Sequence, residues 1–410
     1  MHMTTGEVIR RIRKSLGMTQ SELGAVLGYT QPAISQLEHD GAAVHDVRVL
    51  RRVAKALQVP LAILVVESNE EADVQRRQFF KTAALGAGAA APVAVGSPSL
   101  GDRASATDVK IGPSDVAEIK ATIGQLRDLD WVIGGDRLCQ VAAGQVRYIE
   151  QLLDMGSYTD DIGRELTSAA AEMMTAAGWI YFDAGRREES RQYYARAAQA
   201  GNAAGDNFAV AQALLNASTL ATTGAISYGT GSRPGEGVRL AEAAQSTALK
   251  QGGPHLRTLV ALREAVAHGA VGDKTAVGAA TSRAHRAYES SRGHDPEWVY
   301  LPEVEVNALT GIAFMAAGEH EVAEQHLHAA IRGGGGGPFQ AHTTVRLAQN
   351  HIKAGDIAEG CGLLNSHFDK ITSVASTRLQ VIVDGIAQDV RPQANVPEVR
   401  EFLGRAGERV

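Results

Sequence analysis

The sequence is poor in the residues on which several protein classes depend. It has two cysteines in 410 residues, Cys139 and Cys361, which lie far apart and have no CxxC partner. This excludes a disulfide framework and a cysteine zinc site, and it fits a reducing compartment. No uncharged apolar run reaches the ~18 residues of a membrane span, and the polar start, Met1 to Lys14, lacks the apolar core of a secretion signal. We therefore expect a cytoplasmic protein without a membrane partner.

The local signatures of catalysis and metal binding are also missing. His320-Glu321 with His326 does not have HExxH spacing, and no Ser/His/Asp or Cys/His arrangement has a recognisable signature. The glycine-rich runs 229–237 and 333–337 lack the Lys-Ser/Thr of a phosphate loop and the strand that precedes a dinucleotide fold. The sequence thus predicts a protein that is not an enzyme and that has no cofactor and no metal site.

What the sequence does have is a hydrophobic content of 44% and a charged content of 21%, which support a large buried core. Its length predicts two or three domains. The net charge of −6 is unevenly distributed, because residues 1–66 carry +3 and the remainder carries −9. A basic head on an acidic body suits a polyanionic partner for the head alone.

The organisation along the chain is that of an all-α protein in three parts. Residues 1–66 predict a domain of five short helices, with Val47, Leu50, Ala54 and Leu57 at helical spacing in the fourth. Residues 67–112 predict a linker with one helix in it, which includes Arg76 to Lys81, a stretch similar to a twin-arginine export signal but far from the N-terminus. Residues 113–410 predict helices separated by small-residue turns, with no sustained two-residue alternation.

Residues 19–38 carry the most specific pattern in the sequence. Thr19 with Glu22 forms a capping box, and Gly28 supplies the left-handed residue that ends the helix. Thr30 caps the next helix, and Pro32 is tolerated in its first turn. Gly24 is small where we expect two helices to cross closely. These spacings predict two helices that cross at about 90–120°.

The stretch resembles the Cro/repressor (Xre-type, lambda-repressor-like) helix-turn-helix family over residues 4–66. In that family the second helix enters the major groove of double-stranded DNA, and Gln20 would brace Gln31 and hold a phosphate. The fourth helix carries a basic stripe, which consists of Arg48, Arg51, Arg52 and Lys55. We interpret this stripe as a set of phosphate contacts or, alternatively, as a solvated face. The predicted DNA-binding residues are Gln20, Thr30, Gln31, Pro32, Ala33, Ser35, Gln36, Arg48, Arg51 and Arg52.

The remainder of the chain shows a recurring turn. The glycines of these turns are Gly185, Gly272, Gly318 and Gly355, and their spacing indicates a repeat of about 40 residues, which in a helical chain means a solenoid of stacked helix pairs. Gly311 and Phe314 before Gly318, with Ala323 and Leu327 after it, match the tetratricopeptide pattern. The region therefore resembles tetratricopeptide repeats.

The inner wall of such an array would come from the free face of each first helix. That wall is apolar except for arginines, which favours a groove for a peptide or amphipathic ligand whose carboxylate meets an arginine. The alternative is that a tight superhelix or a dimer partner buries this face. The predicted ligand-binding residues are Trp179, Phe182, Leu262, Arg263, Val266, Leu309, Ile312, Met315 and Arg346.

Together these parts are similar to Gram-positive peptide-sensing regulators and to a broad group of regulators from high-GC bacteria. The resemblance implies a homodimeric transcription regulator whose heads bind two-fold-related half-sites about 34 Å apart, with a peptide or small-molecule effector in the repeats. It does not define the operator, the regulated genes, the sign of regulation or the effector. The alternative from another class is a protein-interaction scaffold, in which the repeats bind a partner protein and the head has a minor role.

Overall fold

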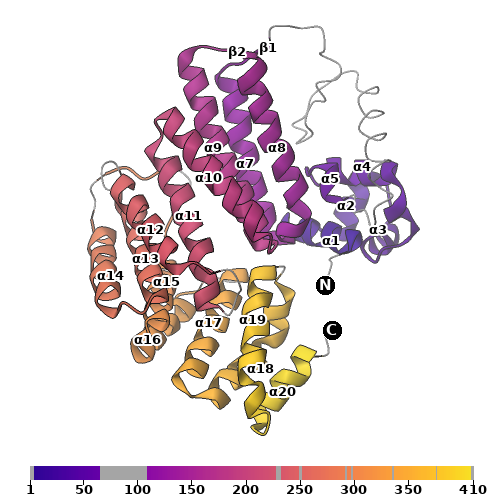
Figure 1. Cartoon of the computed structure of the whole chain (residues 1–410). Helices are drawn as coiled ribbons and strands as arrows, with labels where there is room; N and C mark the ends of the chain where they lie inside the picture. The colour runs from indigo at the N-terminus through magenta and orange to yellow at the C-terminus, as the bar shows by residue number, and fades with distance from the viewer. Residues whose placement is uncertain are drawn as a thin grey trace. The chain divides into compact units, whose positions relative to one another are not determined.

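A computed structural model describes residues 4–64 and 109–407, apart from 228–231, 249–251, 291–292, 297–298, 335–336 and 375. The described residues are almost entirely helical, which confirms the all-α prediction (Figure 1). The exception is a parallel pair of two-residue strands, β1 (Val109–Lys110) and β2 (Gly156–Ser157). Most of the predicted linker, including Arg76 to Lys81, lies outside the described residues.

The head contains the five predicted α-helices and one 3₁₀ turn. Their bounds are α1 Thr5–Ser15, α2 Gln20–Leu27, α3 Gln31–Glu38, η1 Ala42–His45, α4 Val47–Ala56 and α5 Leu61–Leu64. The apolar positions that recur at helical spacing form its core. Ile9, Leu23, Ile34, Leu50 and Leu57 are all at most 4% exposed.

Three long helices and a series of helix pairs follow the linker. The long helices are α7 Pro113–Ile133, α8 Gly135–Met155 and α9 Asp160–Asp183. The later helices are α10 Arg187–Ala204, α11 Asn207–Ile226, α12 Pro234–Ala248, α13 Pro254–Ala270, α14 Lys274–Tyr288, α15 Glu303–Ala316, α16 His320–Arg332, α17 Pro338–Ala354, α18 Ile357–Ser373, α19 Thr377–Val390, η3 Arg391–Gln393 and α20 Pro397–Gly407.

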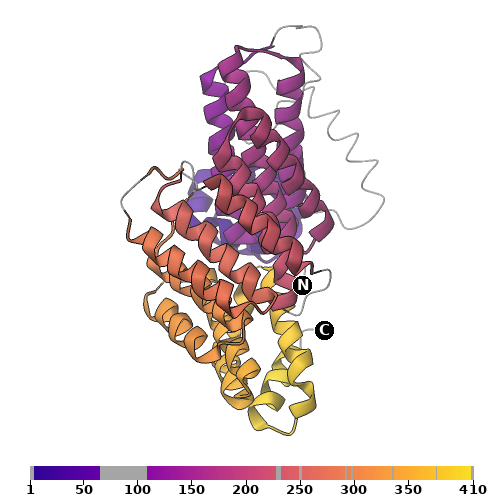
Figure 2. The ribbon, with the colours of Figure 1, turned by 60° about the vertical axis from the view of Figure 1, so that its left-hand side comes forward.

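The contacts divide the chain into two compact units, Met1–Ile180 and Tyr181–Val410, so the division falls inside α9. In the first unit, α1 packs against α7 and α5 against α8. In the second unit, each helix from α10 to α14 packs against the next, and α15 to α18 do the same (Figures 1 and 2). This is the helical-repeat array that the sequence predicted.

The predicted turn glycines have the backbone conformation that the repeat requires. Gly185, Gly272, Gly318 and Gly355 have φ values of 77°, 78°, 77° and 102°, which is the left-handed region. Small residues also sit where helices touch. A Cβ on Gly311 of α15 would lie 2.7 Å from the Cγ of Leu327 on α16, so only glycine allows the two helices to approach this closely.

The second unit curls tightly enough to bring distant helices together. The Gln349 amide on α17 donates to the carbonyl of Ile226, at the end of α11, over 2.8 Å. The Ser376 hydroxyl, which caps α19, donates to Asp183 over 2.8 Å. These contacts join residues more than a hundred positions apart, across the inner side of the array.

Two further properties bear on the sequence predictions. Among the described residues, no helix is both long and apolar enough to cross a membrane. The Cys139 and Cys361 side chains are buried, 2% and 0% exposed, and burial raises the pKa of Cys361 to about 11.

Candidate nucleic-acid interface

The two central helices of the head begin and end at the predicted signals. The Thr19 hydroxyl accepts from the Glu22 amide at 3.2 Å, and the Glu22 carboxylate accepts from the Thr19 amide at 2.7 Å. Gly28 ends α2 with a φ of 70°, and the Thr30 hydroxyl caps α3 by accepting from the Ala33 amide. Local capping therefore fixes where α2 stops and where α3 starts.

Gly24 is required for a different close contact from the one expected. A Cβ at this position would lie 2.6 Å from the backbone oxygen of Tyr29 and 3.5 Å from Cγ1 of Ile34. The tightest approach is thus to the backbone of the turn, and the side chain of α3 comes second. Either way, a larger residue would push α2 away from the turn that precedes α3.

The helix α3 has one buried face and one exposed face. Ile34 and Leu37 are 0% and 2% exposed and anchor the helix in the head. On the other side Gln31, Pro32 and Gln36 are exposed, and Ala33 and Ser35 are half-buried. The residues that the sequence predicted to face DNA therefore share the outward side of one helix.

A network of charged and amide groups, buried at Arg13 and Glu38, holds the start of α3. The Arg13 guanidinium on α1 donates to both carboxylate oxygens of Glu38, over 2.5 and 3.0 Å. The Gln20 amide donates to the same carboxylate over 2.8 Å, and its oxygen accepts from the Gln31 amide over 2.5 Å. The predicted bracing of Gln31 by Gln20 is present, and it continues through Glu38 to Arg13.

Arg13 and Glu38 are functional positions that the sequence analysis missed. They are 6% and 4% exposed, a rare environment for charged residues unless they are paired. The signal was present in the spacing, because Arg13 lies four residues after Ile9 and Glu38 lies four residues after Ile34. Both charges thus occupy positions on the apolar faces of their helices.

The pKa shifts of this pair follow from its surroundings. Burial alone would raise the pKa of Glu38, but hydrogen bonds from Arg13 and Gln20 and the charges of Arg13 and Arg10 outweigh it, and the pKa is lowered. The hydrogen bond to Glu38 raises the pKa of Arg13. Both groups are therefore ionised at neutral pH.

The basic stripe on α4 divides into two kinds of residue. Arg48, Arg51 and Lys55 are exposed. Arg52 is also exposed, but it donates to the carbonyl of Leu27, at the end of α2, and to the Tyr29 hydroxyl at 3.1 Å, and its guanidinium lies 4.9 Å from the centre of the Tyr29 ring. Arg52 therefore holds the turn between α2 and α3, while a phosphate contact by it stays a prediction.

The predicted ligand-binding residues of the repeats are placed mostly in the packed core. Leu262 and Leu309 share one cluster of buried side chains, and Val266 and Met315 share another. Phe182 is 3% exposed, and Ile312 is half-buried against the second of these clusters. Their apolar character is accounted for by packing inside a tight superhelix, which is the alternative that the sequence left open. Trp179 is half-buried on α9 and lies in the other unit.

The two arginines of the predicted ligand site are less buried than most of its apolar residues. Arg263 on α13 and Arg346 on α17 are half-buried, and Arg346 donates to the Ser227 hydroxyl and to the Gln349 side-chain oxygen over 2.7 and 2.8 Å. Burial and the charges of Arg378 and Arg346 lower the pKa of His342 well below its ordinary value. Burial raises the pKa of Glu305, against the charge of Arg263. Arg378 lies 3.5 Å from a carboxylate oxygen of Asp183, and the charge of Glu305 acts on Arg263. The inner side of the array thus gathers three arginines, with Asp183 and Glu305 beside them.

Comparison with known proteins agrees with the local geometry of the head. A helix-turn-helix family model matches residues 9–64, which confirms the predicted motif. No curated protein matches the chain. Among solved structures, the chain is similar to Bacillus thuringiensis PlcR in complex with the peptide PapR7 and DNA, with 15% identity, a TM-score of 0.29, and coverage of 70% of this chain and 95% of that one. A likeness of this extent assigns no residue of the repeats a role.

Proposed function

We propose that the chain is a sequence-specific DNA-binding transcription regulator, whose α3 reads base edges in the major groove. The observation that carries this proposal is the outward face of α3, where Gln31, Pro32 and Gln36 are exposed while hydrogen bonds through Gln20 to the buried Glu38 fix the start of the helix. A glutamine can bond adenine at two positions, which discriminates between bases by about 1–3 kcal/mol. The exposed Arg48, Arg51 and Lys55 on α4 contribute affinity through phosphates without sequence information.

The test is the Gln36→Ala variant, assayed against the site that the wild-type protein selects from a randomised duplex pool. We expect the preference at one base pair to fall by about 1–3 kcal/mol, roughly 5- to 150-fold, with non-specific binding unchanged. Arg48→Ala should instead weaken binding to all duplexes alike and reduce its salt dependence. Gln199→Ala, an exposed glutamine on α10, serves as the matched control. If the wild-type protein selects no site at low salt, the proposal fails and the scaffold interpretation replaces it.

Within this proposal the regulator acts as a homodimer on two-fold-related half-sites about one helical turn apart. A ligand changes the spacing of the heads only if it binds one arrangement of the dimer better than another. The support for an effector site is the group of half-buried arginines, Arg263, Arg346 and Arg378, on the inner side of the second unit. Arginines in such a position favour a carboxylate or another planar anion, in keeping with a peptide or a small acid.

A charge-conserving comparison tests the effector site. Native mass spectrometry of the full chain after incubation with cell extract should detect a bound anionic species. Arg263→Gln should lose at least about tenfold in retention of that species, whereas Arg263→Lys should retain part of it, because a lysine supplies the charge but not the paired hydrogen bonds. Equal retention by wild type and Arg263→Gln would remove Arg263 from the site.

A further inference from the structure

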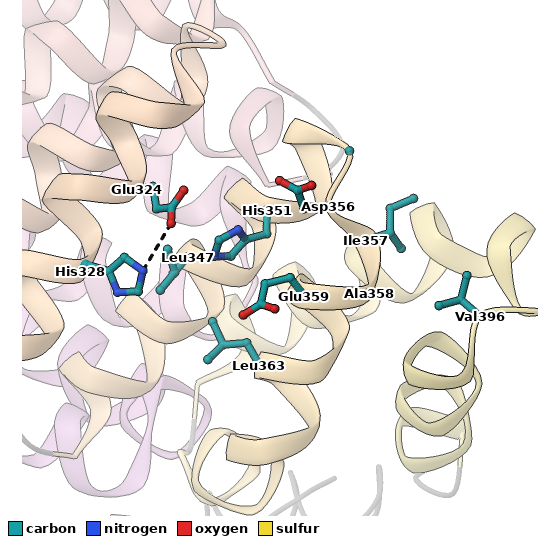
Figure 3. Close-up of a pocket in the computed structure, with 11 residues that line it drawn as sticks. Glu324, His328, Leu347, His351, Asp356, Ile357, Ala358, Glu359, Leu363 and Val396 are labelled. Carbon is teal, nitrogen blue, oxygen red and sulfur yellow. Dashed lines mark ion pairs between the residues drawn. The ribbon is translucent and has the colours of Figure 1, made fainter.

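A second group of polar side chains lines a pocket that the proposed function does not use. The pocket has a volume of about 830 Å³ and lies where α16, α17 and the start of α18 meet (Figure 3). Its polar lining consists of Glu324, His328, His351, Asp356 and Glu359, and no lysine or arginine is among the described residues that line it. The pocket therefore combines two imidazoles with three carboxylates and offers no cation to neutralise them.

Three of these side chains converge on one point. Glu324 and His328 lie four residues apart on α16 and so share one face of that helix, with His328 Nε2 3.6 Å from a carboxylate oxygen of Glu324. His351 reaches the same point from α17, as Figure 3 shows. The ligand atoms of the three side chains all lie within 4.8 Å of one another.

This separation is close to that of a metal site. Zinc binds histidine nitrogen at about 2.0–2.1 Å and carboxylate oxygen at about 2.0–2.2 Å, so tetrahedral ligand atoms lie roughly 3.4 Å apart. Glu324 and His328 are half-buried on the surface of one helix, so rotation about their side-chain bonds can close the remaining gap. His351 is more buried than these two residues, at 8% exposed.

We propose that Glu324, His328 and His351 form a binding site for a divalent transition-metal ion, Zn²⁺ in the first instance. Imidazole and carboxylate are ligands that zinc accepts, and three protein ligands leave a fourth position for water on the open side of the pocket. Asp356 and Glu359 add negative charge around it. Asp356 stands at the N-cap of α18 but its side chain makes no capping hydrogen bond, so capping does not occupy it.

A bound ion would join two successive helix pairs. α16 ends one pair and α17 begins the next. Coordination would fix α16 against α17 independently of the apolar contacts between them. The sequence prediction of no metal site missed the group, because two ligands lie on one helix and the third is 23 residues further on, with no motif that links them.

The test is a calorimetric titration of the chelator-treated full chain with ZnCl₂. We expect the Glu324→Gln and His328→Gln variants each to bind one Zn²⁺ ion per chain fewer with high affinity than the wild type does. Loss of groups that only support a metal ligand already weakens metal binding about 10- to 100-fold, so removal of a ligand should weaken this site by at least that factor. Zn²⁺ should also raise the melting temperature of the wild-type chain, and less so that of the variants.

His367→Gln is the matched control, since His367 is a half-buried histidine on α18 that does not line the pocket. Its titration should superimpose on that of the wild type. If the His328→Gln and wild-type titrations superimpose instead, the proposal is overturned. A sulfur-to-metal charge-transfer band on Co²⁺ binding would also overturn it, because the ion would then bind Cys139 or Cys361. The selection of a DNA site by the zinc-free protein tests the proposed function separately. The zinc proposal can therefore fail while the proposed DNA-binding function holds, and the two failures are distinguishable.

Discussion

Replacing Glu38 by alanine should destabilise the head by about 3–5 kcal/mol. The Glu38 side chain is fully buried, and it accepts hydrogen bonds from Arg13 and from Gln20. Alanine at this position would leave the Arg13 charge buried without its carboxylate, and this uncompensated charge, more than the lost ion pair, accounts for the expected loss. Gln20 would also lose the carboxylate to which its amide donates, and Gln31 is in turn hydrogen-bonded to Gln20.

The measurement is hydrogen exchange of peptides from residues 5–57 in the full chain. Fluorescence would not report on the head, because the three tryptophans are Trp131, Trp179 and Trp298, all outside it. A loss of 3 kcal/mol corresponds to exchange that is roughly 100-fold faster in the most protected amides of α1 and α3. Exchange within about threefold of the wild type would show that the pair does not support the head.

A double variant separates the buried charge from the pair itself. Arg13→Met combined with Glu38→Leu replaces both charges by apolar groups of similar volume, and such replacements are often neutral or stabilising. We expect most of the lost protection to return. We also expect DNA selectivity to remain impaired, because Gln20 no longer has the Glu38 carboxylate as an anchor and so holds Gln31 less firmly.

The same carboxylate makes the head sensitive to acid. The pKa of Glu38 is lower in the folded chain than in the unfolded chain, where it is about 4.3. Its contribution to stability is therefore complete above about pH 5 and is lost as the pH falls through the folded value. Exchange in α1 and α3 should accelerate on acidification by more in the wild type than in the double variant, after correction for intrinsic rates.

The second large effect is expected in the repeats, for Gly269→Ala. Gly269 lies in the last turn of α13, and a Cβ there would be 2.6 Å from the carbonyl oxygen of Ala313 and 2.9 Å from the Cβ of Ala316 on α15. The nearest atom belongs to a helix backbone and cannot rotate away, so α13 and α15 would have to separate. Overpacking of this kind costs about 1–3 kcal/mol, against a gain of at most about 1 kcal/mol in helix propensity.

Gly278→Ala on α14 is the matched control. Gly278 is also inside a helix, but a Cβ added there meets nothing within 4 Å. The same substitution should therefore stabilise the chain by about 0.5–1 kcal/mol. Urea unfolding followed by circular dichroism would compare the two, and equal effects of the two substitutions would contradict the close contact of α13 with α15.

The fold of the head was predictable because its signals are local. Thr19, Glu22, Gly28 and Thr30 act within a few residues of one another, so the spacing in the sequence already defines the ends of α2 and α3. The turn glycines of the repeats are local in the same sense. The boundaries at 66 and 112 stay predictions, while the contacts group α7, α8 and most of α9 with the head.

The parts that could not be predicted depend on residues that are distant in the sequence. The Gln349 amide donates to the carbonyl of Ile226, which lies 123 positions earlier at the end of α11. This contact crosses the inner side of the array, where the sequence predicted a groove. Leu262, Val266, Leu309 and Met315 are apolar and buried, but periodicity does not distinguish a groove from a core. Glu324 and His351 likewise come together only through the packing of α16 against α17.

The burial of the two natural thiols has a practical consequence. Cys361 is protonated at neutral pH, since its pKa is about 11, and the Cys139 and Cys361 side chains are 2% and 0% exposed, so maleimide reagents should leave both unmodified in the folded chain. A single cysteine in place of Val26, which is 62% exposed on α2, would then carry a spin label without prior removal of the native ones. Double electron–electron resonance on that labelled chain would test whether two copies associate, with and without duplex, and would give the distance between their α2 helices if they do.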